Sequence, residues 1–453
     1  EINHTMHFNE LCYKYLVFFV ITGYLLGFSC LAEANEVEKV FTLEQTIRQA
    51  IKANLGLKSS REDTNAAASA RLKQRSNFLP TLGVTYKYKR NYEERTKAVH
   101  GAAVPKNKYT FTGTFTQPVF TGFSLINKYK VAAFNLDLAR FNEKTARQAV
   151  VFEANKVYFN LLKAQKLAAI AKEAVTQILA HKDVAKNFYE VGMTPLNDLL
   201  KAQVELANAR QDLIVAQNNM ETAKSNFNIL LRRQINAPVE VKDIIDYCFF
   251  EKKIDFCFDI AEKNRLEIKA AELQVEIVEK ELKLGKTDYY PSIILKGNYY
   301  KVGTDFDADG GDGISDPDSW DITATASWNF WEWGKTRYGV KEKLSALAQA
   351  RYQHDEMIDN IHLEVKQAYL NTKESEQNIM AVKKAIEQAK ENFRISEERY
   401  KEQMDTSTDV LDAQTLLSRT MTNYYNALYD FKISKAYLYW AMGQAQEVEA
   451  GLE

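Results

Sequence analysis

The chain has 453 residues, enough for about three average domains. Its 59 lysine and arginine residues nearly balance its 60 aspartate and glutamate residues, so net charge gives no indication of a nucleic-acid partner. Glycine (18) and proline (7) are scarce, which favours long uninterrupted helices.

The first 34 residues have the pattern of an export signal. The apolar stretch YLVFFVITGYLL at 15–26 follows a lysine, and Ala32 and Ala34 occupy the small-residue positions of a cleavage site. We therefore expect residues 1–34 to be a signal peptide and the mature chain to start near Asn35. A retained membrane anchor is the alternative.

The rest of the sequence is a tandem duplication. When the sequence is shifted by 211 residues, FLPTLGV at 78–84 aligns with YYPSIIL at 289–295, and NDLLKAQ at 197–203 aligns with TDVLDAQ at 408–414. The expected divisions are a first repeat over 35–237, a linker over 238–253, a second repeat over 254–447 and a tail over 448–453.

Each repeat begins with a helical segment followed by two segments in which apolar and polar residues alternate. In the first of them, Leu82 and Val84 alternate with Thr81 and Thr85. This period of two predicts strands. The four expected strands cover about 81–91, 108–118, 292–303 and 319–330. Prolines mark the expected junctions between helix and strand: Pro80, Pro118 and Pro291.

The length and pattern of these strands are typical of a transmembrane β-barrel. Each is about ten residues long, has aromatic residues near its ends and presents one apolar face. A soluble sandwich with one face in water is the alternative. Four strands cannot close a barrel, which needs about eight, and an open edge is not tolerated in lipid. A membrane barrel therefore requires several chains to share one sheet.

Two much longer helices are expected after the strands of each repeat. Residues 123–191 contain neither glycine nor proline and would extend roughly 100 Å as one helix. In the return helix, apolar residues recur at spacings of three and four from Leu199 to Leu230, and the same seam recurs 211 residues later. Small and large residues alternate along both seams, which predicts coiled packing against neighbouring helices.

Cys248 and Cys257 lie in and just after the linker. In an exported protein, two cysteines this close can close a small disulfide loop. Two isolated thiols are the alternative, and the sequence leaves both open.

The stretch TDFDADGGDGISD at 304–316 resembles a calcium loop. Asp305, Asp307 and Asp309 fall at positions 1, 3 and 5 of the EF-hand pattern. Its flanks alternate as strands, whereas an EF-hand is flanked by helices, and Asp316 stands where the bidentate glutamate belongs. We interpret the stretch as a solvated hairpin loop, with weak calcium binding left open.

The sequence contains no enzyme signature. HExxH, GxSxG and phosphate-binding glycine loops are absent, and the six histidines are scattered. We expect neither catalysis nor a cofactor.

The turns between the long helices carry the most specific motifs, YEVGMTPLNDLLKAQ at 189–203 and YKEQMDTSTDVLDAQ at 400–414. Together with the export signal, the duplication and two strands per repeat, they resemble the outer-membrane efflux (TolC) family over essentially all of the mature chain. The resemblance implies a mainly α-helical homotrimer with a shared 12-stranded β-barrel in the lipid of the outer membrane, continued by a periplasmic α-helical tunnel.

The resemblance also implies a function and partners. The chain would be the passive exit duct of a tripartite efflux or type I secretion system, working with a periplasmic adaptor protein and an inner-membrane pump. Substrates would be small toxic compounds or secreted polypeptides. The alternative is a periplasm-spanning coiled-coil tether without a pore, which leaves the amphipathic strands without a purpose.

Roles for residues at the helix tips follow from the same resemblance. Asp409 and Asp412 match acidic positions at the periplasmic constriction, where threefold repetition would give rings of carboxylates that favour cations. Asp198 and Tyr400 match positions that hold the tips closed. Asp405 stands where related gates often carry arginine, so closure is expected to be organised differently. The expected adaptor contacts are Gly192, Met193, Thr194, Met404 and Thr406.

Three further expectations concern the last helix and the lumen. Ser407 or Thr408 is expected to cap the last helix. Repulsion within a ring of aspartates would raise their pKa, while a helix N-terminus opposes that rise. Polar strand faces rich in threonine and serine imply a neutral lumen of low selectivity.

Overall fold

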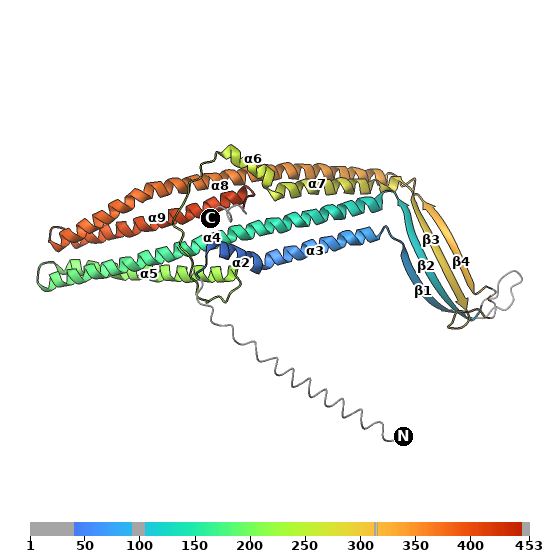
Figure 1. Ribbon diagram of the computed structural model, residues 1–453, viewed down its shortest axis with the longest axis horizontal. Helices are drawn as coiled ribbons and strands as arrows, with labels where there is room; N and C mark the ends of the chain where they lie inside the picture. Colours follow the sequence, from blue (N-terminus) through green and yellow to red (C-terminus); the bar gives the residue numbers. More distant parts are fainter. Residues whose placement is uncertain (1–39, 93–104, 312–313, 315, 446–453) are drawn as a thin grey trace, which may run out of the picture.

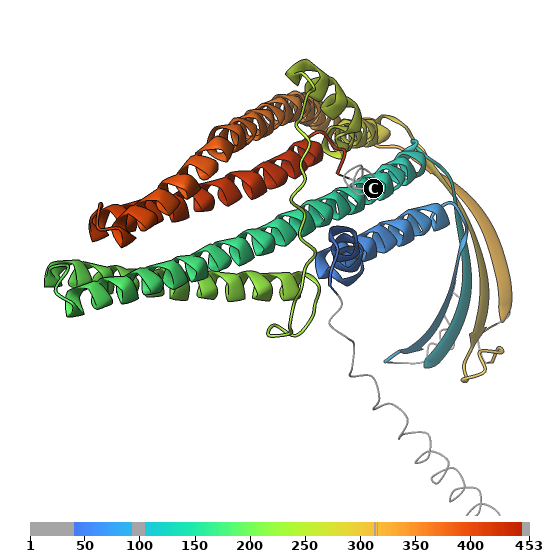
Figure 2. The ribbon, with the colours of Figure 1, turned by 60° about the vertical axis from the view of Figure 1, so that its left-hand side comes forward.

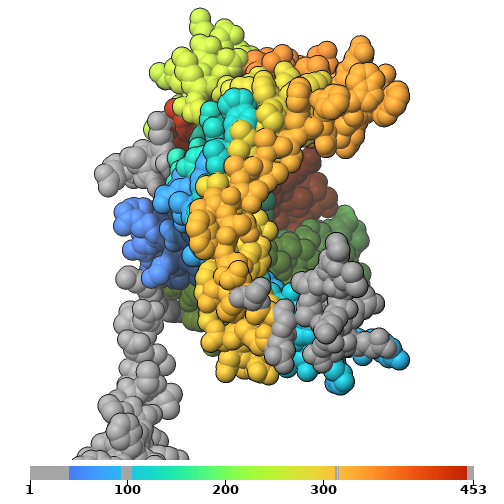
Figure 3. Space-filling view, turned by 90° about the vertical axis from the view of Figure 1, so that its right-hand side faces the viewer, coloured from blue at the N-terminus to red at the C-terminus, as the bar shows by residue number. Residues whose placement is uncertain are grey.

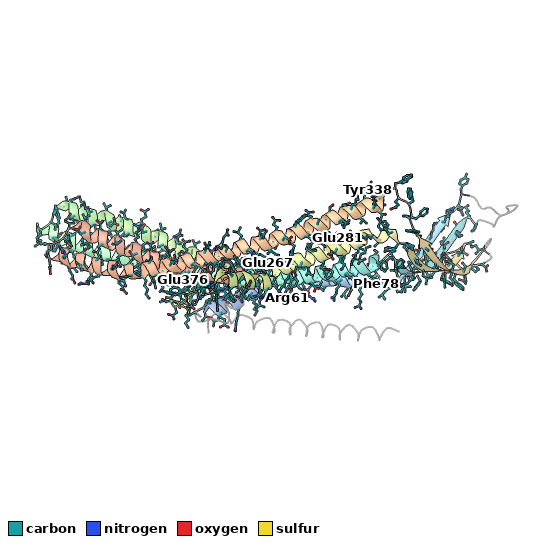
Figure 4. The ribbon with its side chains drawn as sticks, turned by 90° about the horizontal axis from the view of Figure 1, so that it is seen from above. Arg61, Phe78, Glu267, Glu281, Tyr338 and Glu376 are labelled. Carbon is teal, nitrogen blue, oxygen red and sulfur yellow. The ribbon has the colours of Figure 1, made fainter. Side chains whose placement is uncertain are left out.

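The computed structural model describes residues 40–92, 105–311, 314 and 316–445. They form a long rod of helices with a sheet at one end (Figure 1). The tips of the long helices lie at the opposite end, and the view from above shows that the rod is slender along its whole length (Figure 4).

The two repeats contain the same helices and strands in the same order, and the second has an additional 3-10 turn. The first consists of α2 (Leu43–Ala53), α3 (Leu55–Ser76), β1 (Thr81–Arg90), β2 (Asn107–Thr121), α4 (Ser124–Glu190) and α5 (Leu196–Leu230). The second consists of α6 (Ile254–Asn264), α7 (Leu266–Gly285), the 3-10 turn η1 (Thr287–Tyr289), β3 (Ser292–Gly303), β4 (Asp318–Ser327), α8 (Lys335–Lys401) and α9 (Ser407–Ala441). From α2 and α6 (43 and 254) to α5 and α9 (196 and 407), each element starts 211 residues before its counterpart, so the two repeats fold alike.

The four strands form one antiparallel sheet in the order β1-β2-β3-β4. Leu82 pairs with Phe115, and Tyr299 pairs with Gly113 on one side and Trp320 on the other, so apolar side chains share one face. The other described residues leave this face uncovered, with Leu82 82% and Trp320 73% exposed. The sheet is bent (Figure 2), and Figure 3 looks onto the end of the molecule that it forms.

Two strand boundaries differ from those expected. β2 continues through Pro118 to Thr121, with a register shift between Pro118 and Phe120, so Pro118 lies inside a strand and not at a junction. The bulge explains this, because a proline lacks a ladder N–H and is tolerated where the pairing is interrupted. β4 ends at Ser327 and not near residue 330. Pro80 and Pro291 directly precede β1 and β3.

α4 is the central helix of the rod, in contact with α2, α3, α5, α7 and α9. The seam residues nearest the tip are buried on α5 at Leu199, Ala202 and Leu206. Their counterparts Val410 and Ala413 are buried on α9. Because small residues alternate with large ones, the helices of each pair pack closely along their length. Within the described residues, no helix is both long and apolar enough to cross a bilayer.

α5 ends at Leu230, and an extended linker then crosses the helices at mid-length (Figures 1 and 2). Lysines donate to alternate carbonyl oxygens of this linker: Lys432 to Asp246 (2.5 Å), Lys435 to Cys248 (2.7 Å) and Lys373 to Phe250 (2.5 Å). Burial lowers the pKa of Lys432 to about 8. The linker is therefore fastened to the second repeat by cationic donors.

The disulfide considered from the sequence is not formed. Cys248 is exposed in the linker, whereas Cys257 is buried inside α6 and both thiols are free. Cys257 packs in an apolar cluster with Phe250 and Ala261, and burial raises the pKa of its thiol to about 11. The Cys257 thiol is thus a small group of the apolar core.

Candidate functional site

Both helix tips turn with the same backbone geometry. Gly192 follows α4 with φ 74°, and Gln403 follows α8 with φ 63°. The next amide closes each turn, with Met193 N donating to Phe188 O and Met404 N donating to Arg399 O, both at 2.8 Å. Each long helix therefore ends in a left-handed residue that reverses the chain within a few residues.

The last helix is capped by Thr406, and not by Ser407 or Thr408 as expected. The Thr406 Oγ1 accepts from Asp409 N at 3.3 Å, and Asp409 Oδ2 accepts from Thr406 N at 3.0 Å. This reciprocal arrangement is a capping box that satisfies two amides at the start of α9. Thr406 was expected to contact an adaptor, and in the structure it caps the N-terminus of α9.

The two aspartates expected at the constriction lie three positions apart near the start of α9, and both are exposed. Hydrogen bonds from the Thr406 hydroxyl and then from its backbone lower the pKa of Asp409 below its usual value. The Asp409 carboxylate is therefore held ionised within one chain. Repulsion from further copies of Asp409 and Asp412 stays a prediction.

A buried cluster joins the two helix pairs just behind the tips. The His181 Nε2 on α4 lies 2.8 Å from Ser407 Oγ at the start of α9, and both residues are buried. The Tyr400 ring lies 4.8 Å from the His181 ring and 5.6 Å from the Phe188 ring. Nearby, Lys201 Nζ of α5 donates to Thr408 Oγ1 at 3.0 Å. We call this set the inter-pair contact: His181, Lys201, Tyr400, Ser407 and Thr408.

Burial controls the charge of His181. It lowers the pKa of the imidazole to about 4, although the carboxylates of Glu397 and Asp198 act in the opposite direction. Tyr400 is 3% exposed, and its hydroxyl is buried near Ser407 without a hydrogen bond of ordinary geometry. Burial and then the charge of Asp198 raise the pKa of that hydroxyl. The side chains of His181 and Tyr400 are consequently uncharged near pH 7.

The two other aspartates expected at the constriction, Asp198 and Asp405, have different surroundings. Asp198 is half-buried in the first turn of α5, near His181 and Tyr400. Asp405 accepts from Arg399 Nε at 3.0 Å, which braces the turn between α8 and α9 and does not join the two pairs. Within one chain, the inter-pair contact thus joins the α4–α5 pair to the α8–α9 pair behind the tips.

His181 was missed from the sequence, although a signal for it existed. It stands between the buried Ile178 and Ala185 at spacings of three and four, so it occupies a seam position. A histidine in an apolar seam marks a buried polar contact. Its partner Ser407 lies 226 residues away and could not be identified from spacing.

The remaining tip residues present a small exposed surface. Met193 and Met404, which are equivalent in the two repeats, are 55% and 63% exposed. Gly192 and Thr406 are also exposed, and Thr194 is half-buried. Uncovered methionines at two equivalent turns form an adaptable apolar surface.

The described residues of the acidic hairpin loop contact the sheet. Among the described residues, no group of three or more histidine, cysteine, aspartate or glutamate side chains is placed to hold a metal ion. Asp309 instead pairs with Lys301 at 3.5 Å, and the Phe306 ring packs 5.5 Å from Tyr86. Asp305 and Asp307 flank that aromatic anchor in a loop fastened to the sheet.

Comparison with known proteins shows the family. The outer membrane efflux protein family matches residues 46–230 and 258–444. Outer membrane protein TolC of Escherichia coli is 23% identical over 93% of this chain and 85% of its own length. The alkaline protease secretion protein AprF of Pseudomonas aeruginosa is 18% identical over 86% of this chain and 82% of its own length.

Solved structures share the fold. The Campylobacter jejuni CmeC outer membrane channel superposes with a TM-score of 0.78 at 16% identity, covering 92% of this chain and 91% of that one. The Vibrio cholerae outer membrane protein VceC gives 0.78 at 16% identity, covering 88% and 96%. The family match spans both repeats, and the chain therefore belongs to the outer membrane efflux protein family.

Proposed function

We propose that the chain is the outer-membrane exit duct of a tripartite efflux or type I secretion system and that it works as a homotrimer. The observation that carries this proposal is that the sheet, among the described residues, has an exposed apolar face and two unpaired edges. Its apolar face is exposed at Leu82, Trp320 and Ile322, and its outer strands β1 and β4 each lack a partner on one side within the described chain. Three copies would supply 12 strands, pair every edge and turn the apolar face to lipid.

The helices extend this barrel into the periplasm. α4 and α8 have 67 residues each, and such a helix is roughly 100 Å long. At their far ends the inter-pair contact holds the α4–α5 pair against the α8–α9 pair. Opening the duct would separate the pairs and break the bond between His181 and Ser407. A buried histidine would thus take the place of the arginine that related gates often carry.

Partners would supply energy and opening force. The exposed tip residues Met193 and Met404 are suited to an adaptor, because methionine side chains adjust to the surface they meet. An inner-membrane pump would then load the duct. Among the relatives, one is named for secretion of alkaline protease and another for efflux, so polypeptides and small compounds both fit the proposal. A periplasmic tether would have no use for a bare apolar sheet.

Insertion into a planar lipid bilayer tests the proposal. The purified mature chain should produce discrete steps of ion current, absent from a matched preparation of cells lacking the gene. A chain that fails to associate with liposomes and carries no current would contradict the proposal and favour the tether.

A further inference from the structure

We propose that Lys87, Lys89 and Lys108 form an anion-binding zone on the polar face of the sheet, near the end distant from the helices, and that this zone selects negatively charged solutes. The inference rests on the proposed function, because the polar face lines a lumen only in a closed barrel. It replaces the expectation of a neutral lumen.

The strand register places the three lysines together. Lys89 is the direct partner of Lys108, and Lys87 pairs with Thr110 one step further along the same face. Directly opposed residues have Cβ atoms about 5 Å apart, and like charges at such positions repel each other. Two ammonium groups therefore face each other across β1 and β2, an arrangement that a bound anion would stabilise.

Acidic partners for these lysines are lacking in the part of the chain that the structure describes. The polar face holds four lysines, Lys296 being the fourth, against one aspartate, Asp321. Asp321 lies on β4, at the other edge of the sheet from β1, and accepts from Asn298 at 3.0 Å. The segment 93–104 between β1 and β2 contains two glutamates, one arginine and one lysine, so its formal charge is balanced.

A lysine on the opposite face of the sheet, in contrast, has acidic partners. Lys301 lies on the apolar face and pairs with Asp309 at 3.5 Å and Asp318 at 3.9 Å. A cation that faces lipid thus has carboxylates beside it, whereas the three cations of the zone do not. Their charge is left available to a solute.

In a trimer the zone would become a ring of nine ammonium groups at one level of the lumen. Such a ring attracts anions and raises their local concentration, as rings of charged side chains do in other pores. The other end of the duct carries Asp409 and Asp412. The duct would therefore have opposite electrostatic polarity at its two ends, and its outer part would favour anionic solutes.

Current block by a polyanion tests this inference. Pyrenetetrasulfonate, added to the side that the hairpin loops face, should block the current of the wild-type duct. The triple variant K87Q/K89Q/K108Q should need at least about tenfold more blocker, since each lost charge weakens the attraction. The triple glutamate variant K87E/K89E/K108E should instead be blocked by spermine. The particle mass in detergent shows that each variant still assembles.

Arg90 provides a matched control. It follows Lys89 on the same strand and carries the same charge, but its side chain lies on the opposite face. Lys89→Gln should weaken the block, and Arg90→Gln should leave it unchanged. Equal effects of these two changes, or full block of the triple glutamine variant, would overturn the inference. Absence of any current from the wild-type chain would instead overturn the duct itself.

Discussion

At the scale of single residues, the chemistry of the tip depends on which groups are buried. His181 is 7% exposed between two long helix pairs, while Asp409 is exposed and bound by its own capping threonine. The first is kept neutral by burial, and the second is kept ionised by hydrogen bonds. His181 and Asp409 are therefore protonated in different pH ranges.

We predict that mild acid favours separation of the helix pairs through His181. The closed state holds the imidazole at a pKa of about 4, whereas exposure on opening restores the usual value of 6.5. The open state binds more protons between these values, so the closed state loses stability as pH falls from about 6.5 towards 4, by up to about 3 kcal/mol per chain. Glu397 and Asp198 are the carboxylates that act on this site.

Bilayer conductance between pH 7 and pH 4.5 measures the effect. Wild-type current should rise with acid, and His181→Gln, which cannot take up a proton, should remove the dependence in this range. His354→Gln changes a histidine of α8 outside the tip and should keep the wild-type profile. Asp409 titrates below its usual pKa and contributes only at lower pH. An unchanged profile in His181→Gln would contradict the role of this residue.

Loss of the capping threonine should loosen the start of α9. Thr406→Ala removes the hydroxyl that accepts from Asp409 N and donates to Asp409 Oδ2, and helix caps of this kind are worth about 1 kcal/mol. The pKa of Asp409 should also rise, because the hydrogen bond that lowers it most is lost. Chemical denaturation and carboxylate titration by NMR of the tip would measure both changes. Thr415→Ala, exposed on the same helix, should have neither effect.

The sequence predicted the tip only in part at this scale. Asp409, Tyr400 and the exposed methionines were predicted at the tips because both turns carry a long, specific motif. The structure places them there, and their roles stay predictions. The capping residue was misassigned, since Thr406, Ser407 and Thr408 are three adjacent hydroxyl residues with similar capping preference. His181 was missed because its partner comes from the other repeat.

At the scale of elements, the two tip turns carry different residue types at their left-handed position. Gly192 and Gln403 occupy equivalent left-handed positions, yet only glycine adopts that conformation without steric cost. A Cβ added at Gly192 would meet no atom within 4 Å, so the cost of a side chain there is that of the backbone alone. The two turns thus offer a matched pair of substitutions.

We predict that Gly192→Ala weakens the first tip and that Gln403→Gly strengthens the second. Left-handed backbone costs an ordinary residue about 1 kcal/mol, so the two effects should be of that size and of opposite sign. Hydrogen exchange of the amides of Met193 and Met404, which close the two turns, would report them separately. Slower exchange in Gly192→Ala would contradict the argument.

The order of elements could be predicted from the sequence better than their ends. Periodicity and the shift of 211 residues indicated two strands and two long helices in each repeat, and the structure has them. The proline at 118 was taken as a stop, although a bulge lets the strand continue. The spacing of Cys248 and Cys257 left a bond and two free thiols equally open, and in the structure Cys257 is buried in α6 while Cys248 is exposed in the linker.

At the scale of the whole molecule, the chain is incomplete as a membrane protein. Its sheet has two free edges within the described residues and an apolar face that no helix covers. The sequence and the structure of one chain both indicate unpaired strand edges and an exposed apolar face. The neighbouring strands and the lipid that would cover them lie outside a single chain. β1 and β4 are the two outer strands of one sheet, so β1 of one copy can pair with β4 of the next. Copies of the same chain would therefore pair both edges without a second kind of protein.

The number of chains per particle tests this account most directly. The mature chain is extracted in detergent, and its protein mass is measured by light scattering corrected for bound detergent. The account predicts three chains in a particle that needs detergent to remain dispersed. A single chain, stable without detergent, would contradict the shared barrel, the duct and the lysine ring together, and would leave the coiled-coil tether as the explanation of the fold.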